Sequence, residues 1–150
     1  MAIYVDADAC PVKTEVVKVA ERHRLAVHMV SNAYMGLPKS SLVKRTIVPG
    51  NPDAADDWIA ENILPGDICV TADIPLADRC IKAGAAALGP TGKPFTEDSI
   101  GSALAMRDIM SHLRETGENQ GSGKVFTTKD RSRFLEGLER TIQAEKRKRP

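Results

Sequence analysis

Several aspartates in this sequence stand at positions that a folded chain could bring to one place. Asp6 and Asp8 follow a short apolar run at residues 3–5, and Asp73 follows another apolar run. Asp78 comes five residues after Asp73. An acid that closes an apolar strand is costly to bury unless another group satisfies it. These four side chains are therefore candidates for one acidic site.

Four crowded carboxylates repel one another and raise one another's pKa, and a divalent cation removes that repulsion. Hard oxygen ligands favour Mg²⁺ or Mn²⁺ over zinc. The sequence thus predicts a Mg²⁺ or Mn²⁺ site at these aspartates. The alternative for Asp78 is an ion pair with Arg79 or Lys82 on a solvated helix face.

A second acidic group lies at the start of an expected helix over residues 53–63. Asp53, Asp56 and Asp57 occupy positions i, i+3 and i+4, which share one helix face. Acids in a first turn also interact favourably with the helix dipole. We expect Asp53 to cap the helix. For Asp56, a favourable interaction with the helix dipole remains an alternative to a ligand role.

The elements that must position these residues alternate between strands and helices. Further helices are expected from Pro11 and from Pro75, where proline suits the first turn. The expected strands cover residues 3–5, 26–30, 46–48, 68–71 and 85–88. This alternation predicts an α/β fold with a mainly parallel sheet and helical crossovers. Ligands bind beyond the carboxyl ends of such strands, where the aspartates stand.

The last third of the chain is expected to be helical. Residues 96–99 resemble a helix cap, residues 115–124 form a flexible linker or loop, and a final helix begins near Asp130. Residues 125–150 thus comprise a C-terminal helix and a basic tail. At 150 residues, the chain is expected to form a single domain.

Composition narrows the functional classes. The chain is 42% hydrophobic and 27% charged, which is typical of a globular protein. No apolar run reaches the roughly 20 residues of a membrane span, and no secretory signal is visible. Three cysteines without a C-x-x-C pair suit a reducing compartment, so a cytoplasmic location is expected.

Charge is distributed unevenly along the chain. Residues 1–123 carry 12 Lys/Arg and 16 Asp/Glu, whereas residues 124–150 carry 9 and 4. The basic end could contact the phosphate backbone of RNA, or it could be a solvated helix end. The oligomeric state is left open.

A strand that ends in Asp-x-Asp also resembles the haloacid-dehalogenase-like phosphatases, in which Asp6 would attack phosphorus and Asp8 would act as acid and base. Ser31-Asn32 and Lys44 resemble further signatures of that family. Against this hypothesis, only Ala9 and Cys10 separate Asp8 from the next helix, which leaves no room for the usual flap. Cys10 has no local histidine, so a cysteine nucleophile is not expected.

Longer blocks resemble the YaiI/YqxD family of uncharacterised bacterial proteins. They are Tyr4-Val5-Asp6-Ala7-Asp8-Ala9-Cys10-Pro11-Val12-Lys13, Asp53-Ala54-Ala55-Asp56-Asp57-Trp58-Ile59-Ala60, Val70-Thr71-Ala72-Asp73-Ile74-Pro75-Leu76-Ala77-Asp78-Arg79-Cys80, Ala105-Met106-Arg107-Asp108 and Asp130-Arg131-Ser132-Arg133-Phe134-Leu135. That family is similar to PIN-like domains. The resemblance implies a three-layer fold whose strand-end aspartates hold Mg²⁺ or Mn²⁺ for phosphodiester hydrolysis.

The resemblance also implies roles for individual residues. Asp6 and Asp73 would be the central ligands, joined by Asp78 and by one of Asp56 and Asp57, with Asp8 as an additional candidate. The candidate phosphate-binding residues are Lys13, Arg79, Arg107, Arg131 and Arg133. Arg107, Arg131 and Arg133 could instead lock the C-terminal helices to the body, and Lys13 and Arg79 could simply solvate a helix face. A non-catalytic module that binds RNA or protein remains a further alternative.

Overall fold

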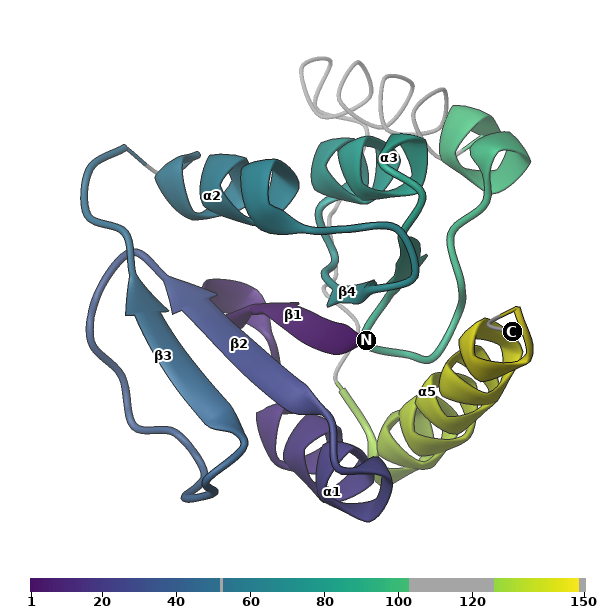
Figure 1. The fold of residues 1–150 in the computed structure, drawn as a ribbon, viewed down its shortest axis with the longest axis horizontal. Coiled ribbons are helices and arrows are strands. Elements are labelled where there is room, and N and C mark those ends of the chain that lie inside the picture. Colours follow the sequence, from purple (N-terminus) through teal and green to yellow (C-terminus); the bar gives the residue numbers. More distant parts are fainter. Residues whose placement is uncertain (52, 103–125, 149–150) are drawn as a thin grey trace, which may run out of the picture.

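A computed structural model of the chain describes residues 1–51, 53–102 and 126–148. Within these ranges the protein has three layers, in which a β-sheet lies between two layers of helices (Figure 1). Arg107 and the expected loop at residues 115–124 fall outside the described residues. None of the helices in the described ranges combines the length and apolar composition that crossing a bilayer requires.

The sheet contains five parallel strands in the order β3-β2-β1-β4-β5. The strands are β1 (Ala2–Asp6), β2 (Ala26–Ser31), β3 (Val43–Ile47), β4 (Ile68–Val70) and β5 (Ala86–Leu88). The chain builds outward from β1 to β3 and then returns to place β4 on the other side of β1. The predicted parallel α/β architecture is confirmed. The strand order reverses between β1 and β4, and open sheets bind ligands at such a switch point.

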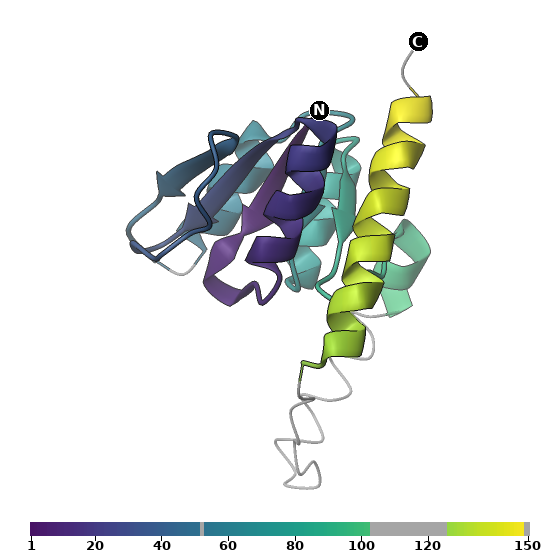
Figure 2. The same cartoon turned by 90° about the horizontal axis from the view of Figure 1, so that it is seen from below.

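Helices cover both faces of the sheet. Helices α1 (Lys13–His23) and α5 (Thr128–Arg147) lie side by side on one face, as Figure 2 shows. Helices α2 (Ala54–Asn62) and α3 (Ile74–Lys82) cover the other. Residues 97–102 are also helical. This arrangement is the three-layer, PIN-like architecture with a C-terminal helix that the sequence predicts.

Side-chain alternation along the central strands decides which residues face which layer. Ile3 and Val5 of β1 pack in the core under α1 and α5, whereas Tyr4 packs toward α2 and α3. Because successive side chains of a strand point to opposite faces, Asp6 belongs to the Tyr4 face. Thr71 follows Cys69 in the same way after β4. Asp6 and Thr71 are therefore both directed toward the α2–α3 layer.

Helix α5 is fixed to the body through its apolar face and through its backbone. Phe134, Leu138 and Ile142 are fully buried in the core shared with α1 and the strands. A β-carbon on Gly137 would lie 2.3 Å from the carbonyl oxygen of Gly92, in the loop after β5. The helix thus touches that loop backbone to backbone, which only a residue without a side chain permits.

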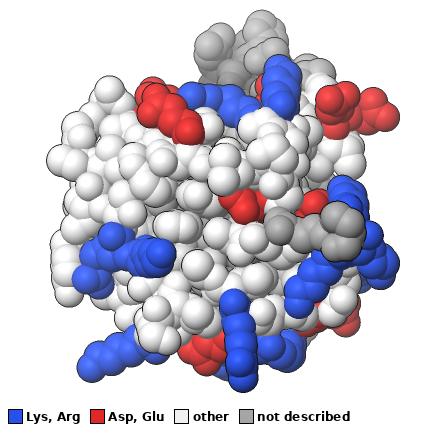
Figure 3. All heavy atoms as spheres, viewed as in Figure 1, with Lys and Arg blue, Asp and Glu red and all other residues white. Residues whose placement is uncertain are grey.

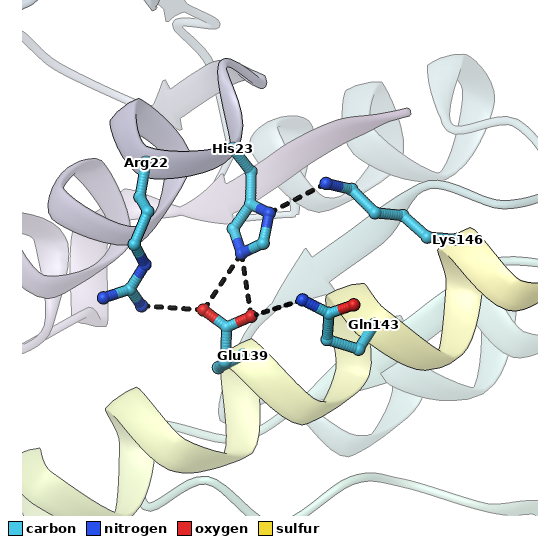
Figure 4. Close-up of polar contacts among 5 residues, drawn as sticks. All are labelled: Arg22, His23, Glu139, Gln143 and Lys146. Carbon is cyan, nitrogen blue, oxygen red and sulfur yellow. Dashed lines mark hydrogen bonds and ion pairs between the residues drawn. The ribbon is translucent and has the colours of Figure 1, made fainter.

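Polar side chains join α5 to α1 across the same interface (Figure 4). The Glu139 carboxylate contacts Nε2 of His23 at 2.8 Å and accepts hydrogen bonds from Arg22 and Gln143. Lys146 Nζ lies 2.8 Å from Nδ1 of His23. An ammonium group only donates hydrogen bonds, so Nδ1 of His23 is the acceptor from Lys146. Nε2 of His23 then carries the hydrogen and donates a hydrogen bond to the Glu139 carboxylate. These hydrogen bonds hold the pKa of Glu139 down at about 2.

Several element boundaries differ by a few residues from the predictions, and the differences at the third strand and the last helix have a clear cause. The third strand covers residues 43–47 instead of 46–48, because it is an edge strand that pairs only with β2 and leaves Lys44 and Arg45 exposed. The last helix begins at Thr128, before the expected Asp130, because Thr127 and Asp130 form a reciprocal capping box.

Candidate functional site

The switch point between β1 and β4 carries a hydrogen-bonded group of polar residues. The buried Thr71 hydroxyl donates to Oδ2 of Asp6 at 3.0 Å and accepts the backbone N–H of Asp73 at 2.9 Å. Oδ1 of Asp73 in turn accepts the N–H of Leu76 at 3.0 Å, which caps α3. Thr71 therefore links the two strand-end aspartates directly. Sequence reasoning missed this residue, although it lies between them in the Val70-Thr71-Ala72-Asp73 block.

Asp56 joins this group from the first turn of α2. Its pKa is raised to about 7 by burial and by the charges of Asp6, Asp73, Asp53 and Asp57, in that order. The pKa of Asp6 is also raised, chiefly by burial and then by Asp73 and Asp8, although the hydrogen bond from Thr71 opposes the shift. The structure thus brings Asp6, Asp56 and Asp73 into mutual electrostatic contact.

A cavity of about 370 Å³ opens over Asp56 and Asp73, whereas Asp6 is not among the residues that line it. Asp53, Asp56, Asp57 and Asp73 line it together with Arg79. The Arg79 guanidinium donates to Oδ1 of Asp57 at 2.7 Å, so Asp57 is paired whereas Asp56 lies among like charges. Asp53 occupies the N-cap position of α2, as expected, but its side chain makes no capping hydrogen bond.

Asp8 lies beside the cluster, in the single 3₁₀ turn Ala7–Ala9 that follows β1. Its Oδ2 accepts the backbone N–H of Asn32 at 2.9 Å, just after β2. The Asn32 side chain donates to the carbonyl oxygens of Val48 and Asn51, both at 3.1 Å. Asn32 therefore ties Asp8 to the ends of two neighbouring strands.

Asp78 lies apart from the other acids. It pairs with Lys82 one turn later in α3, at 2.8 Å, and it is not among the charges that raise the pKa of Asp6 or of Asp56. This geometry is the solvated ion pair that the sequence offers as the alternative to a ligand role. The structure thus groups Asp6, Asp8, Asp56 and Asp73 and leaves Asp78 outside.

The predicted phosphate-binding residues are dispersed. Of those described, only Arg79 lines the acidic cavity. Lys13 donates to the carbonyl oxygen of Cys10 at 2.8 Å. Arg131 donates to Glu15 at 3.0 Å and stacks on Phe126, an arrangement that locks α5 to α1. Arg133 is exposed on α5, and Figure 3 shows further basic side chains around the end of that helix.

The donor chemistry of the cluster fits a hard divalent cation, because carboxylates and a hydroxyl are the groups that Mg²⁺ and Mn²⁺ prefer. Burial is the main cause of the raised pKa values of Asp6 and Asp56, and neighbouring carboxylates raise both further by a repulsion that a cation would remove. In residues 1–51, 53–102 and 126–148, no three His, Cys, Asp or Glu side chains are arranged to hold a metal ion. The chemistry therefore fits, while coordination requires the carboxylates to move closer together.

Two other hypotheses find little support in the geometry. Lys44 lies near the start of β3, level with His28 of β2, and not at the strand ends where a phosphate-binding lysine would be needed. Cys10 is buried, and burial raises the pKa of its thiol. A raised pKa lowers the thiolate fraction, which disfavours a nucleophilic role.

Comparison with known proteins identifies relatives along the whole chain. Residues 4–144 match the family described as "Uncharacterized BCR, YaiI/YqxD family". A UPF0178 protein of Rhodospirillum rubrum is 63% identical over 150 residues, which cover 99% of this chain and 100% of the relative. UPF0178 proteins of Parvibaculum lavamentivorans and Rhizobium meliloti are 62% and 56% identical, over 99% and 97% of this chain and 97% and 99% of their own. No solved structure gives a significant match.

Proposed function

Starting from a chain that belongs to the YaiI/YqxD family, we propose that its acidic cluster binds Mg²⁺ or Mn²⁺ and serves the hydrolysis of phosphodiesters in RNA. Asp6, Asp56 and Asp73 would hold the cation, and Asp8 would lie at the edge of the cluster. The observation that carries this proposal is the Thr71 bridge, which holds Asp6 and Asp73 together at the switch point of the sheet.

The hydrogen bonds that keep Asp6 and Asp73 at the same end of the sheet support a binding function. Asp6 and Asp73 are fixed by hydrogen bonds to Thr71 and to the N-terminus of α3. Asp56 faces them from another helix and keeps a pKa of about 7, so it ionises most readily when a cation is present. A cluster that is destabilised by its own charge is a favourable receptor for a divalent ion.

Each residue of the site would have its own role in the hydrolysis. When bound, the cation supplies a water of lowered pKa and neutralises charge on the phosphate. Asp56, whose carboxyl would be ionised once the cation is present, would help to hold the cation from the α2 side. Arg79, which lines the cavity and pairs with Asp57, would bind phosphate oxygens through its planar fork. No side-chain nucleophile is required.

Calorimetric titration with Mn²⁺ tests the metal site. We predict that Asp6→Asn and Asp73→Asn each abolish Mn²⁺ binding while the fold is kept or gains stability, because each removes a like charge. The matched control is Asp98→Asn, an exposed acid outside the cluster, which should bind as the parent chain does. Asp78→Asn should also retain binding, because Asp78 pairs with Lys82. Undiminished Mn²⁺ affinity in Asp73→Asn would refute the proposal.

The catalytic part needs its own experiment. The full chain with Mn²⁺ is incubated with a labelled single-stranded oligoribonucleotide, and we expect cleavage that Asp73→Asn eliminates. Phosphorylation of Asp6 that can be trapped would instead identify a phosphatase. RNA binding that survives both Asp6→Asn and Asp73→Asn, without any cleavage by the parent chain, would identify a non-catalytic binding module.

A further inference from the structure

A second cavity, of about 350 Å³, opens next to the acidic one. Ala72 and Ile74 line it, whereas Asp73 between them lines the acidic cavity. The two cavities therefore share one short segment of backbone. A molecule with one group at the acids and another in the second cavity would lie across this segment.

The lining of the second cavity is largely apolar and has few polar groups. Pro90, Pro94 and the half-buried ring of Phe95 supply apolar surface, and Thr91 and Lys93 supply a hydroxyl and an ammonium group. Lys93 makes no ion pair with any residue in the described part of the chain. Small-molecule sites combine apolar walls with few polar groups in volumes of about 300–1,000 Å³. The cavity is of the size that suits one planar ring system.

The loop that forms the wall is held in place by backbone contacts. The Gly89 N–H donates to the carbonyl oxygen of Lys93 at 3.0 Å, and the Phe95 N–H donates to that of Ala87 at 2.9 Å. Gly92, with φ of +88°, contacts the α5 backbone. A wall fixed at three points is preformed, so binding in the cavity costs little conformational entropy.

We propose that this cavity binds a nucleobase of the nucleic acid whose phosphate lies at the acidic cluster, an inference that rests on the proposed function. The Phe95 ring provides an apolar surface on which a base stacks. The Lys93 ammonium complements the negative charge of the adjoining phosphate. These two residues supply what a nucleotide requires, which is a flat apolar contact beside a cation.

This assignment has a consequence for the class of substrate. A base inside a duplex is stacked on both sides, and it must leave the stack before it can enter a pocket. A site that takes one base beside the reacting phosphate therefore selects single-stranded nucleic acid. Paired RNA of the same sequence should be a poor substrate.

The test is calorimetric titration of the full chain with AMP and, separately, with ribose 5-phosphate, which lacks the base. Both titrations are run with and without Mn²⁺. We expect AMP to bind about tenfold more tightly than ribose 5-phosphate, from the usual contribution of base stacking. Phe95→Leu should remove this difference. Tyr34→Leu is the matched control, because Tyr34 is an aromatic side chain exposed elsewhere, and it should preserve the difference.

A second variant is needed in case Phe95→Leu fails to fold. Lys93→Gln alters an exposed side chain, and we expect it to weaken AMP and ribose 5-phosphate equally. Equal affinity of the parent chain for the two compounds would overturn the inference, as would a loss of the difference in Tyr34→Leu alone. If Mn²⁺ itself fails to bind, the metal proposal falls, and the titrations without Mn²⁺ still decide whether the base is recognised.

Discussion

The carboxyl group of Asp56 keeps its proton to a pH well above the usual range for aspartate. Its pKa of about 7 compares with 3.8 for an unperturbed aspartate, the value expected in the unfolded chain. Between about pH 4 and pH 7 the folded state therefore binds more protons than the unfolded state. The contribution of Asp56 to stability falls as the pH rises through that window. Asp6, whose pKa is also raised, acts in the same direction.

For this carboxyl group we predict that the free energy of unfolding decreases from about pH 5 to about pH 8 in buffer with a chelator. Asp56→Asn should flatten this dependence and be more stable than the parent chain at about pH 8. Urea denaturation across this range measures both effects. The exposed Asp98→Asn should keep the parent's slope, and the same slope in Asp56→Asn would contradict the assignment.

The sequence predicts where the acidic residues gather better than it predicts which residues belong to the group. Asp6 and Asp73 could be placed together because both end parallel strands. Asp56 and Asp57 could not be distinguished, because adjacent helical residues point about 100° apart and the rotation of α2 over the sheet decides which faces inward. Thr71 was missed because a hydroxyl residue after a strand is too common to suggest that it links the carboxylate of one aspartate to the backbone N–H of another.

Among the elements, α5 depends on a glycine where it crosses the loop after β5. A β-carbon on Gly137 would meet backbone atoms of Gly92, which cannot move aside as a flexible side chain can. We predict that Gly137→Ala destabilises the protein by roughly 1–3 kcal/mol in spite of the helix propensity of alanine. The control is Gly101→Ala in another helix, where the new methyl group meets no atom of the described residues within 4 Å. Chemical denaturation should show a neutral or stabilising effect there; equal effects would contradict the close contact.

The pairing of α1 with α5 also has a polar component that can be measured. Glu139 accepts hydrogen bonds from three side chains, including the largely buried His23. We predict that Glu139→Ala lowers the free energy of unfolding by roughly 1–3 kcal/mol, since hydrogen bonds to charged groups are involved. Glu136→Ala removes an exposed acid from the same helix and should change it by less than about 0.5 kcal/mol. Similar losses in both variants would show that helix propensity, and not the contact with α1, is responsible.

Element type was more predictable than element position. The helices and the central strands follow from apolar periodicity, because both faces of the central strands are buried. Strand β3 was misplaced because an edge strand keeps polar residues such as Lys44 and Arg45 exposed and so lacks an apolar run. The aspartate of the capping box, Asp130, was mistaken for the start of α5, which Thr127 in fact caps.

For the whole molecule, metal binding should appear as thermal stabilisation. A ligand that binds only the folded state at 100 times its Kd stabilises that state by about 2.7 kcal/mol. For a chain of this size we therefore predict that saturating Mn²⁺ raises the Tm by roughly 5–10 °C. Asp73→Asn should show no increase. An increase of the same size in that variant would locate the binding elsewhere.

The position of α5 in the sequence has a consequence for how the protein is made. Phe134, Leu138 and Ile142 complete the core over β1, β2 and β4, yet they come after every described strand. On the ribosome, the sheet is therefore synthesised before the helix that covers one of its faces. A nascent chain that stalls before residue 142 leaves the part of this face that α5 covers, beside α1, in contact with water, and exposed apolar surface promotes aggregation. Burial of this part of the core therefore follows the synthesis of α5, after the sheet itself has been made.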